Sequence, residues 1–122
     1  MYNHNEKGIK YDLKKRVFLF SLDIIKLTKN LERSYVVETL AKQLIRSGCS
    51  IGANIIEAQS APSKKDFANF YNIALKSANE TIYWLELIKR TSEKANDIDD
   101  IIEENQQICR IIAKSLITMR GK

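Results

Sequence analysis

The chain has 122 residues, of which 44% are hydrophobic and 29% are charged, and its formal net charge is +5. This size and composition are typical of one soluble globular domain that buries a core without disulfides or metal. No apolar run of about 18 residues is present, which excludes a transmembrane helix, and the polar segment 1–8 lacks the apolar stretch of a signal peptide. We therefore expect a cytoplasmic protein with no membrane partner.

The chain has only one proline and four glycines, which favours long helices over strands and turns. After a flexible N-terminal tail at residues 1–9, we expect a single domain at residues 10–122. Its first helix is predicted over about 12–31, with Asp12 as the N-cap. Apolar residues step by three and four along this segment and so share one face: Val17, Phe20, Ile24, Leu27 and Leu31.

Two further helices flank the only proline, Pro62. They are predicted over about 34–59 and about 64–93, because apolar residues continue the same helical stepping on both sides of a short turn. Ser63 and Asp66 resemble a capping box, with Asp in place of Glu, at the start of the second of these helices. The turn should therefore fold the two helices into a hairpin.

A last helix is predicted over about 97–119, which completes an all-α fold, an antiparallel up-down-up-down four-helix bundle. The central hairpin is unusually poor in charge: segments 38–60 and 67–88 hold 45 residues and only seven charged ones. A helix that faces water on one side normally shows a polar face. We therefore expect copies of the chain to cover one another in a homo-oligomer.

Polar residues form one stripe on the helix predicted over 34–59. Gln43, Arg46, Ser50, Asn54 and Glu57 fall within about 80° of one another at 100° per residue. Two interpretations stand. The stripe is either the solvated face of this helix, or it is part of a structural polar network that fixes the register of the hairpin.

The network interpretation makes specific predictions. If the hairpin pairs residues whose numbers sum to about 124, Arg46 forms an ion pair with Glu80, and Gln43 lies close by. The network would consist of Gln43, Arg46, Asn54, Glu57 and Glu80. In the same register two small residues, Gly48 and Gly52, would face Ala74 and Ser77 at a close helix crossing.

The segment 43–80 carries a resemblance to a known family. The segment contains these motifs in chain order: Arg46-Ser, Ser50-Ile, Asn54-Ile-x-Glu-Ala, a basic turn, Phe67-x-x-Phe, and then an alanine, a serine and Glu80. In these residues the chain resembles the four-helix bundle proteins encoded in intervening sequences of bacterial 23S rRNA genes. Relatives often have Ala-Gly where this chain has Ala58-Gln59, which affects only the expected C-cap of that helix.

The resemblance implies a homo-oligomeric bundle, typically a pentamer. The family also includes the accessory variability determinant proteins of diversity-generating retroelements, which bind nucleic acid and a reverse transcriptase. For the ordinary members the resemblance implies no established molecular function.

No arrangement of residues typical of catalysis is present. The only histidine, His4, lies in the polar N-terminal segment, and the Glu-x-x-His pairs of di-iron bundles are absent. The acids clustered at 97–104 are read as residues favoured by a helix N-terminus rather than as a metal site. Cys49 and Cys109 are read as small buried hydrophobes. We expect no enzyme activity, no cofactor and no metal.

Positive charge is expected to gather at one end of the bundle. In a bundle of four helices with alternating directions, one end holds the start of the first helix and the end of the last helix. The formal charges at that end sum to +6, and those at the other end sum to −2. The macrodipole disfavours cations in the first turn of a helix, so their placement there suggests a use. The candidate nucleic-acid-binding residues are Lys10, Lys14, Lys15, Arg16, Lys64, Lys65, Lys114 and Arg120.

The leading hypothesis is a non-enzymatic homo-oligomer that binds nucleic acid through phosphate contacts from this basic surface, with structured RNA favoured by the resemblance. The first alternative is a protein-interaction scaffold, for a partner such as a reverse transcriptase, with no nucleic-acid binding of its own. A regulatory or toxin–antitoxin component is a third. The aromatic residues are mostly at core spacing, which does not indicate base stacking, and an ordinary basic surface also accounts for the charge.

Overall fold

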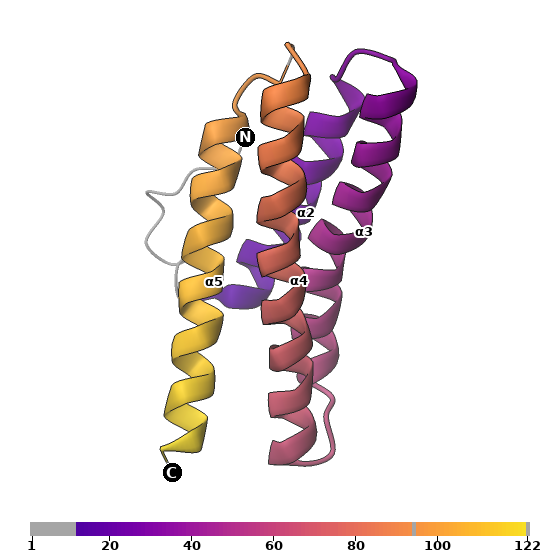
Figure 1. Cartoon of the computed structure of the whole chain (residues 1–122). Coiled ribbons are helices and arrows are strands. Elements are labelled where there is room, and N and C mark those ends of the chain that lie inside the picture. The colour runs from indigo at the N-terminus through magenta and orange to yellow at the C-terminus, as the bar shows by residue number, and fades with distance from the viewer. Residues whose placement is uncertain (1–11, 94, 122) are drawn as a thin grey trace.

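The computed structural model describes residues 12–93 and 95–121, which fold into four helices (Figure 1). These are α2 (Leu13–Lys29), α3 (Tyr35–Ala58), α4 (Lys64–Thr91) and α5 (Ile98–Arg120). The described residues contain no strand, so the predicted all-α class is confirmed. The helix bounds differ from the predicted ones by one or two residues, and the predicted tail at 1–9 lies outside the described residues.

Side-chain caps explain where three of the helices begin. At the start of α2, the predicted cap Asp12 accepts a hydrogen bond from the Lys15 backbone N–H (3.2 Å). The Ser34 hydroxyl accepts a hydrogen bond from the Val37 backbone N–H (3.1 Å), and the Ser63 hydroxyl accepts one from the Asp66 backbone N–H (3.0 Å). Each bond satisfies one of the N–H groups that a helix start leaves without a partner. The start of α5 differs, because Asp97 has a φ of 65° and makes no side-chain cap. Aspartate tolerates this left-handed conformation better than most residues.

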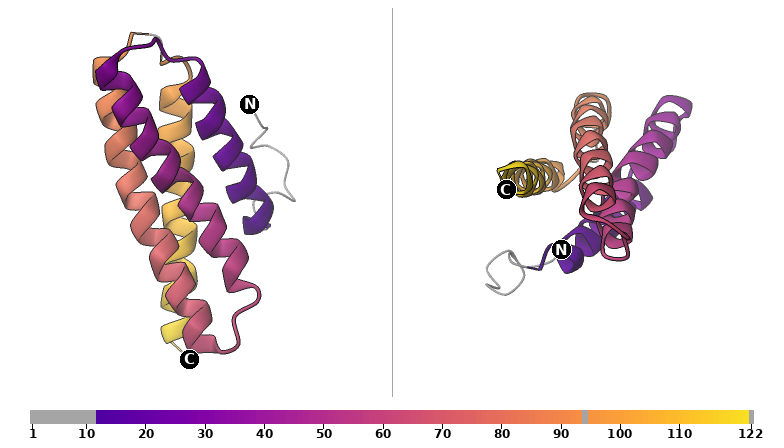
Figure 2. Two further views of the ribbon diagram at one scale, coloured as in Figure 1. Left: turned by 90° about the vertical axis from the view of Figure 1, so that its right-hand side faces the viewer. Right: turned by 90° about the horizontal axis from the view of Figure 1, so that it is seen from below.

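Neighbouring helices run antiparallel around one core (Figures 1 and 2). Between α3 and α4, contacts join Arg46 to Glu80 and Ser50 to Ser77, so residue numbers rise on one helix as they fall on the other. The side chain of Phe20 is fully buried in the core. The other fully buried large apolar side chains are Val17, Ile24, Leu44, Ile51, Ile55, Leu85, Ile88, Ile108 and Ile112.

Helix α2 is the shortest helix and covers only part of the bundle. It begins opposite the middle of α5, because Arg16 in its first turn bonds to Glu104 and Gln107 of that helix. About 13 residues of α5, or roughly 20 Å at 1.5 Å per residue, lie between that level and Arg120. Figure 2 shows that α2 starts well short of the end where α5 finishes. The sequence-based prediction that the first helix starts at the same end is therefore wrong.

Gly48 and Gly52 lie against α2, so the prediction that they face Ala74 and Ser77 of α4 is wrong. A Cβ atom added at Gly48 would lie 3.1 Å from Cγ1 of Ile24, and one at Gly52 would lie 3.4 Å from the Ser21 hydroxyl. Both glycines therefore face α2. The residue before Gly48, Ser47, is the one that faces α4. One position on a helix changes the direction by 100°, which is enough to exchange one neighbouring helix for another.

Hydroxyl groups line the seam between α3 and α4. The Thr81 hydroxyl donates to the Ser47 hydroxyl (2.9 Å), and the Ser77 hydroxyl donates to that of Ser50 (2.9 Å). The two residue numbers in each of these pairs sum to 127 or 128. The hairpin register therefore differs by a few residues from the predicted one, in which paired residue numbers sum to about 124. Small polar side chains let the two backbones approach while their hydrogen-bonding groups remain satisfied.

The predicted ion pair between Arg46 and Glu80 is confirmed. The Arg46 Nε also donates to Gln43 Oε1 (3.0 Å), as predicted, and the Trp84 indole N–H donates to Glu80 Oε2 (3.0 Å). The Trp84 donor first, and the Arg46 guanidinium second, hold the pKa of the Glu80 carboxyl below its ordinary value. Because the Arg46 side chain is 55% exposed, this pair adds at most about 1 kcal/mol to the stability of a single chain.

Two members of the predicted network behave differently. The Asn54 amide donates to the Ser50 carbonyl oxygen (2.8 Å) and hydroxyl (3.1 Å), so it joins the seam through a neighbour on its own helix. Glu57 is exposed, and its side chain makes no hydrogen bond or ion pair within the described part of the chain. The stripe is thus a half-buried network at its centre and a solvated face at its end.

Several large apolar side chains remain exposed on α2 and α3. Phe18 is 60% exposed and Ile56 is 49% exposed. Leu22 on α2 and Ile45 on α3 are also exposed. We call Phe18, Leu22, Ile45 and Ile56 the outer apolar surface.

Candidate nucleic-acid interface

A basic hollow lies where α4 begins and α5 ends. Ser63 caps α4 just after the turn at Pro62, which places the next two residues, Lys64 and Lys65, exposed in the first helical turn. Arg120 comes from the last turn of α5, and these three cations line a common hollow of about 370 Å³. Its other lining residues are Ala68, Asn72, Leu116 and Met119. The structure thus brings together three of the predicted phosphate-binding residues.

A second, larger hollow adjoins the first and shares Met119 with it. It is a groove of about 660 Å³, open to solvent, between the start of α4 and the last turns of α5. Lys114, a fourth predicted residue, stands on its α5 side. The remaining lining residues are Arg16, Phe67, Tyr71, Ile111, Ser115 and Thr118. We call this hollow the aromatic groove.

Two stacked aromatic rings form the α4 side of the aromatic groove. The ring centroids of Phe67 and Tyr71 lie 4.7 Å apart with an interplanar angle of 23°. Phe67 is half-buried, and Tyr71 is buried. Burial raises the pKa of the Tyr71 phenol, which a hydrogen bond with Gln59 partly offsets, so Tyr71 is uncharged near neutral pH. The sequence-based interpretation that the aromatic residues are mostly at core spacing fits Tyr71, which lies in the core, and Phe67 packs against that core.

The charged residues that line these two hollows are all cations. Among the described residues, no acidic side chain lines the basic hollow or the aromatic groove. The one acid in the first turn of α4, Asp66, accepts a hydrogen bond from the Ser63 hydroxyl (2.9 Å). Lys64 and Lys65 stand against the positive end of the helix dipole, which costs a few tenths to about 1 kcal/mol each. An anion bound at this end would remove that cost.

Two predicted residues lie elsewhere. Lys14 and Lys15 are exposed in the first turn of α2, where the Lys15 backbone N–H donates to Asp12 (3.2 Å). These two lysines line neither the basic hollow nor the aromatic groove. Lys10 lies outside the described residues.

The prediction for Arg16 needs correction, because its side chain is only 7% exposed and is held by an acid. Its Nε donates to Glu104 Oε2 (2.6 Å), and its Nη2 donates to Glu104 Oε1 (2.8 Å) and to Gln107 Oε1 (2.7 Å). Glu104 is 2% exposed. This two-bond carboxylate pair neutralises the guanidinium, so Arg16 supports the structure and is not available to a phosphate.

The sequence does contain a signal for this ion pair. Arg16 stands four residues before Phe20, and Glu104 stands four residues before Ile108, so each charge interrupts an apolar stripe that faces the core. Two opposite charges on two core-facing stripes indicate a buried pair. Sequence reasoning grouped Glu104 with acids at a helix start, and that interpretation is wrong for this residue.

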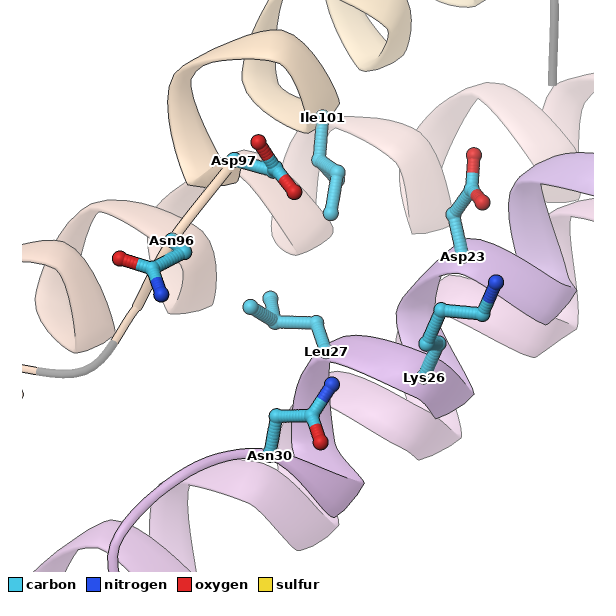
Figure 3. A pocket seen from close by; sticks show the side chains of 7 residues that line it. All are labelled: Asp23, Lys26, Leu27, Asn30, Asn96, Asp97 and Ile101. Carbon is cyan, nitrogen blue, oxygen red and sulfur yellow. The ribbon is translucent and has the colours of Figure 1, made fainter. Parts of the chain in front are cut away.

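The opposite end of the bundle is chemically different. A hollow of about 450 Å³ lies there between α2 and the start of α5 (Figure 3). Two of its lining residues are acids, Asp23 and Asp97, and one is a lysine, Lys26. Figure 3 shows that the remaining lining residues are Leu27, Asn30, Asn96 and Ile101. The predicted difference in charge between the two ends therefore appears in the hollows themselves.

No catalytic constellation emerges from residues 12–93 and 95–121. In these ranges no three His, Cys, Asp or Glu side chains lie close enough to hold a metal ion. Cys49 and Cys109 are free thiols, and burial raises the pKa of both, which makes them poor nucleophiles. None of the described helices combines the length and apolar character needed to cross a membrane.

Fold and surface together define an all-α, four-helix bundle protein with one basic end and an exposed apolar surface. The chain belongs to the 23S rRNA-intervening sequence protein family, whose model matches residues 10–114. This confirms the resemblance drawn from segment 43–80.

A solved structure supports the same assignment. The chain is 38% identical to a protein of unknown function from the S23 ribosomal protein family of Bacteroides thetaiotaomicron, whose crystal structure was determined at 1.70 Å resolution. The match covers 85% of this chain and 97% of that chain, with a TM-score of 0.74. No curated protein matches the chain.

Proposed function

We propose that this protein is a non-enzymatic, homo-oligomeric bundle that binds structured RNA through phosphate contacts at its basic end. One observation carries the proposal. Lys64, Lys65, Lys114 and Arg120 come from two helices that are far apart in sequence, yet they gather around two adjoining hollows that no described acid lines. The name of the family, which refers to 23S rRNA, is consistent with an RNA ligand. With such a ligand we place the protein in the cytoplasm.

The geometry suits phosphate oxygens more than any other anion class. The first turn of α4 directs backbone N–H groups outward at the same place where Lys64 and Lys65 stand, and N–H groups at a helix start favour phosphate. Lysine and arginine contacts to phosphate position an RNA chain without reading its sequence. We therefore expect weak sequence specificity and a steep dependence on salt.

A binding titration tests this function. A fluorescently labelled RNA stem–loop should bind the pure protein saturably, as measured by fluorescence anisotropy. Four phosphate contacts, each contributing about 0.7 to the salt slope, predict a loss of about 50-fold between about 50 mM and about 200 mM salt. Absence of binding at the lower salt concentration would contradict the proposal and would favour the competing function.

The competing function is a scaffold for a protein partner without RNA binding of its own. The observation that favours it is the outer apolar surface on α2 and α3, which a monomer would leave in water. Exposed apolar patches of this kind mark protein–protein interfaces. We assign this surface to contacts between copies of the chain, in the pentamer that the family resemblance implies, because an interface there would cover the charge-poor outer side of α3.

Oligomerisation can be tested with exposed glutamates. Phe18→Glu and Ile56→Glu should lower the mass measured by light scattering toward the 14.1 kDa of one chain while the circular dichroism spectrum stays helical, because buried charges at an interface are costly. Ile117→Glu is the matched control, since Ile117 is 64% exposed on α5, outside this surface. A wild-type protein that scatters as one chain at all concentrations would rule out the oligomer.

A further inference from the structure

We propose that the aromatic groove receives one unpaired nucleobase of the bound RNA, so that the protein prefers single-stranded segments, such as loops, to duplex. This inference rests on the proposed function and adds the class of RNA that the basic end selects. It concerns a part of the surface that phosphate contacts alone would leave unused.

The groove exists because α2 is short. Because α2 starts opposite the middle of α5, no fourth helix among residues 12–93 and 95–121 lies over the first turns of α4 and the last turns of α5 (Figure 2). The resulting space of about 660 Å³ lies within the range of roughly 300–1,000 Å³ found for small-molecule sites. It is therefore large enough for a nucleoside.

The walls of the groove suit a flat, partly polar ring. Phe67 supplies partly exposed aromatic surface on the α4 side, with the buried Tyr71 ring stacked against it, and Ile111 and Met119 supply aliphatic surface on the α5 side. Stacking of a base on an aromatic side chain contributes about 5- to 150-fold in affinity and tolerates any base. The Thr118 hydroxyl, on an exposed residue that lines the groove, offers a hydrogen-bonding group to the edge of the ring.

Charge complementarity identifies the ligand as a nucleotide rather than a neutral ring. Lys114 lines the groove itself, and Lys64, Lys65 and Arg120 line the basic hollow that adjoins it through Met119. A base in the groove would place the phosphates on either side of it among these four cations. Unstacking and unpairing a base from a duplex costs energy, whereas a loop base is already available.

The test compares two forms of one RNA. A short RNA strand containing the fluorescent base 2-aminopurine is titrated with wild-type protein, alone and annealed to its complement. We expect the single strand to bind at least about tenfold more tightly than the duplex, with a change in 2-aminopurine fluorescence as the base stacks in the groove.

Two substitutions at the groove, each with a matched control, identify the site. Thr118→Trp should fill the groove from an exposed position, and Phe67→Leu should remove an aromatic ring while keeping apolar volume. Each should weaken single-strand binding by about 5- to 150-fold and leave duplex binding unchanged. The controls are Gln106→Trp, at an exposed α5 position, and Phe70→Leu, at a half-buried α4 position, because neither residue lines the two hollows. Circular dichroism checks that all four variants fold.

The outcomes separate this inference from the function on which it rests. Equal affinity for single strand and duplex, or unchanged binding by both groove variants, would overturn the inference while salt-dependent RNA binding stands. Failure to bind either RNA would overturn both. A change in oligomer mass caused by Thr118→Trp but not by Gln106→Trp would assign the groove to a second copy of the chain and overturn the inference.

Discussion

Replacing Glu104 with glutamine should lower the free energy of unfolding by about 3–5 kcal/mol, because it removes the carboxylate that pairs with the buried Arg16 guanidinium. The two side chains are 7% and 2% exposed, and Nε and Nη2 of Arg16 lie 2.6 and 2.8 Å from the two carboxylate oxygens. A neutral amide can accept a hydrogen bond but cannot balance the charge. Urea unfolding followed by circular dichroism measures the effect.

The neighbouring residue provides the control. Glu103 is exposed on the same helix, so Glu103→Gln should change stability by less than about 0.5 kcal/mol. The double variant Arg16→Met with Glu104→Leu should recover most of the loss, because apolar pairs of similar volume often replace buried ion pairs without cost. A Glu104→Gln protein as stable as wild type would show that this ion pair does not hold α2 to α5.

Removing the four cations of the basic end should weaken RNA binding by about 10²- to 10³-fold at about 0.1 M salt. The variant carries Lys64→Gln, Lys65→Gln, Lys114→Gln and Arg120→Gln. At that salt concentration, each contact to a phosphate of a single strand raises the affinity about fivefold, because binding releases counterions from the RNA. The loss of one contact therefore lowers the affinity about fivefold. Because the lysines are exposed and Arg120 is also exposed at the helix end, the fold should remain intact. Fluorescence anisotropy with the RNA stem–loop measures the loss.

A variant with the same change in net charge tests whether position matters. In this variant, glutamine replaces four exposed cations toward the other end of the bundle, so four positive charges are removed as well. The replaced residues are Lys26, Lys29, Arg33 and Lys42. We expect a loss of less than about tenfold, because these side chains lie beyond the Debye length of roughly 10 Å from the basic end. Equal losses in the two variants would indicate attraction by net charge and not a defined interface.

Helix positions were predictable from the sequence because local rules determine them. Asp12 and Ser63 cap the helices that they were expected to cap, and the bounds differ from prediction by at most two residues. The Arg46–Glu80 pair was predictable too, because the short turn at Pro62 leaves the hairpin little freedom in register. Long charged side chains also tolerate the small register error that remained.

Features that depend on which helix a side chain faces were harder to predict. Gly48 faces α2 and not α4, since a single residue step turns a side chain through 100°. Arg16 was read as a free cation because periodicity alone does not show that Glu104, 88 residues later, lies opposite it. The aromatic groove was missed for a related reason: nothing in the sequence shows that α2 begins too late to cover Phe67.

The dependence of RNA affinity on salt tests the central claim most directly. For wild-type protein, the slope of log affinity against log salt should be steeper than that of the four-glutamine variant by about 3, which is four contacts at about 0.7 each. Parallel slopes for the two proteins would show that Lys64, Lys65, Lys114 and Arg120 touch no phosphate. The basic end would then have some other role than binding RNA.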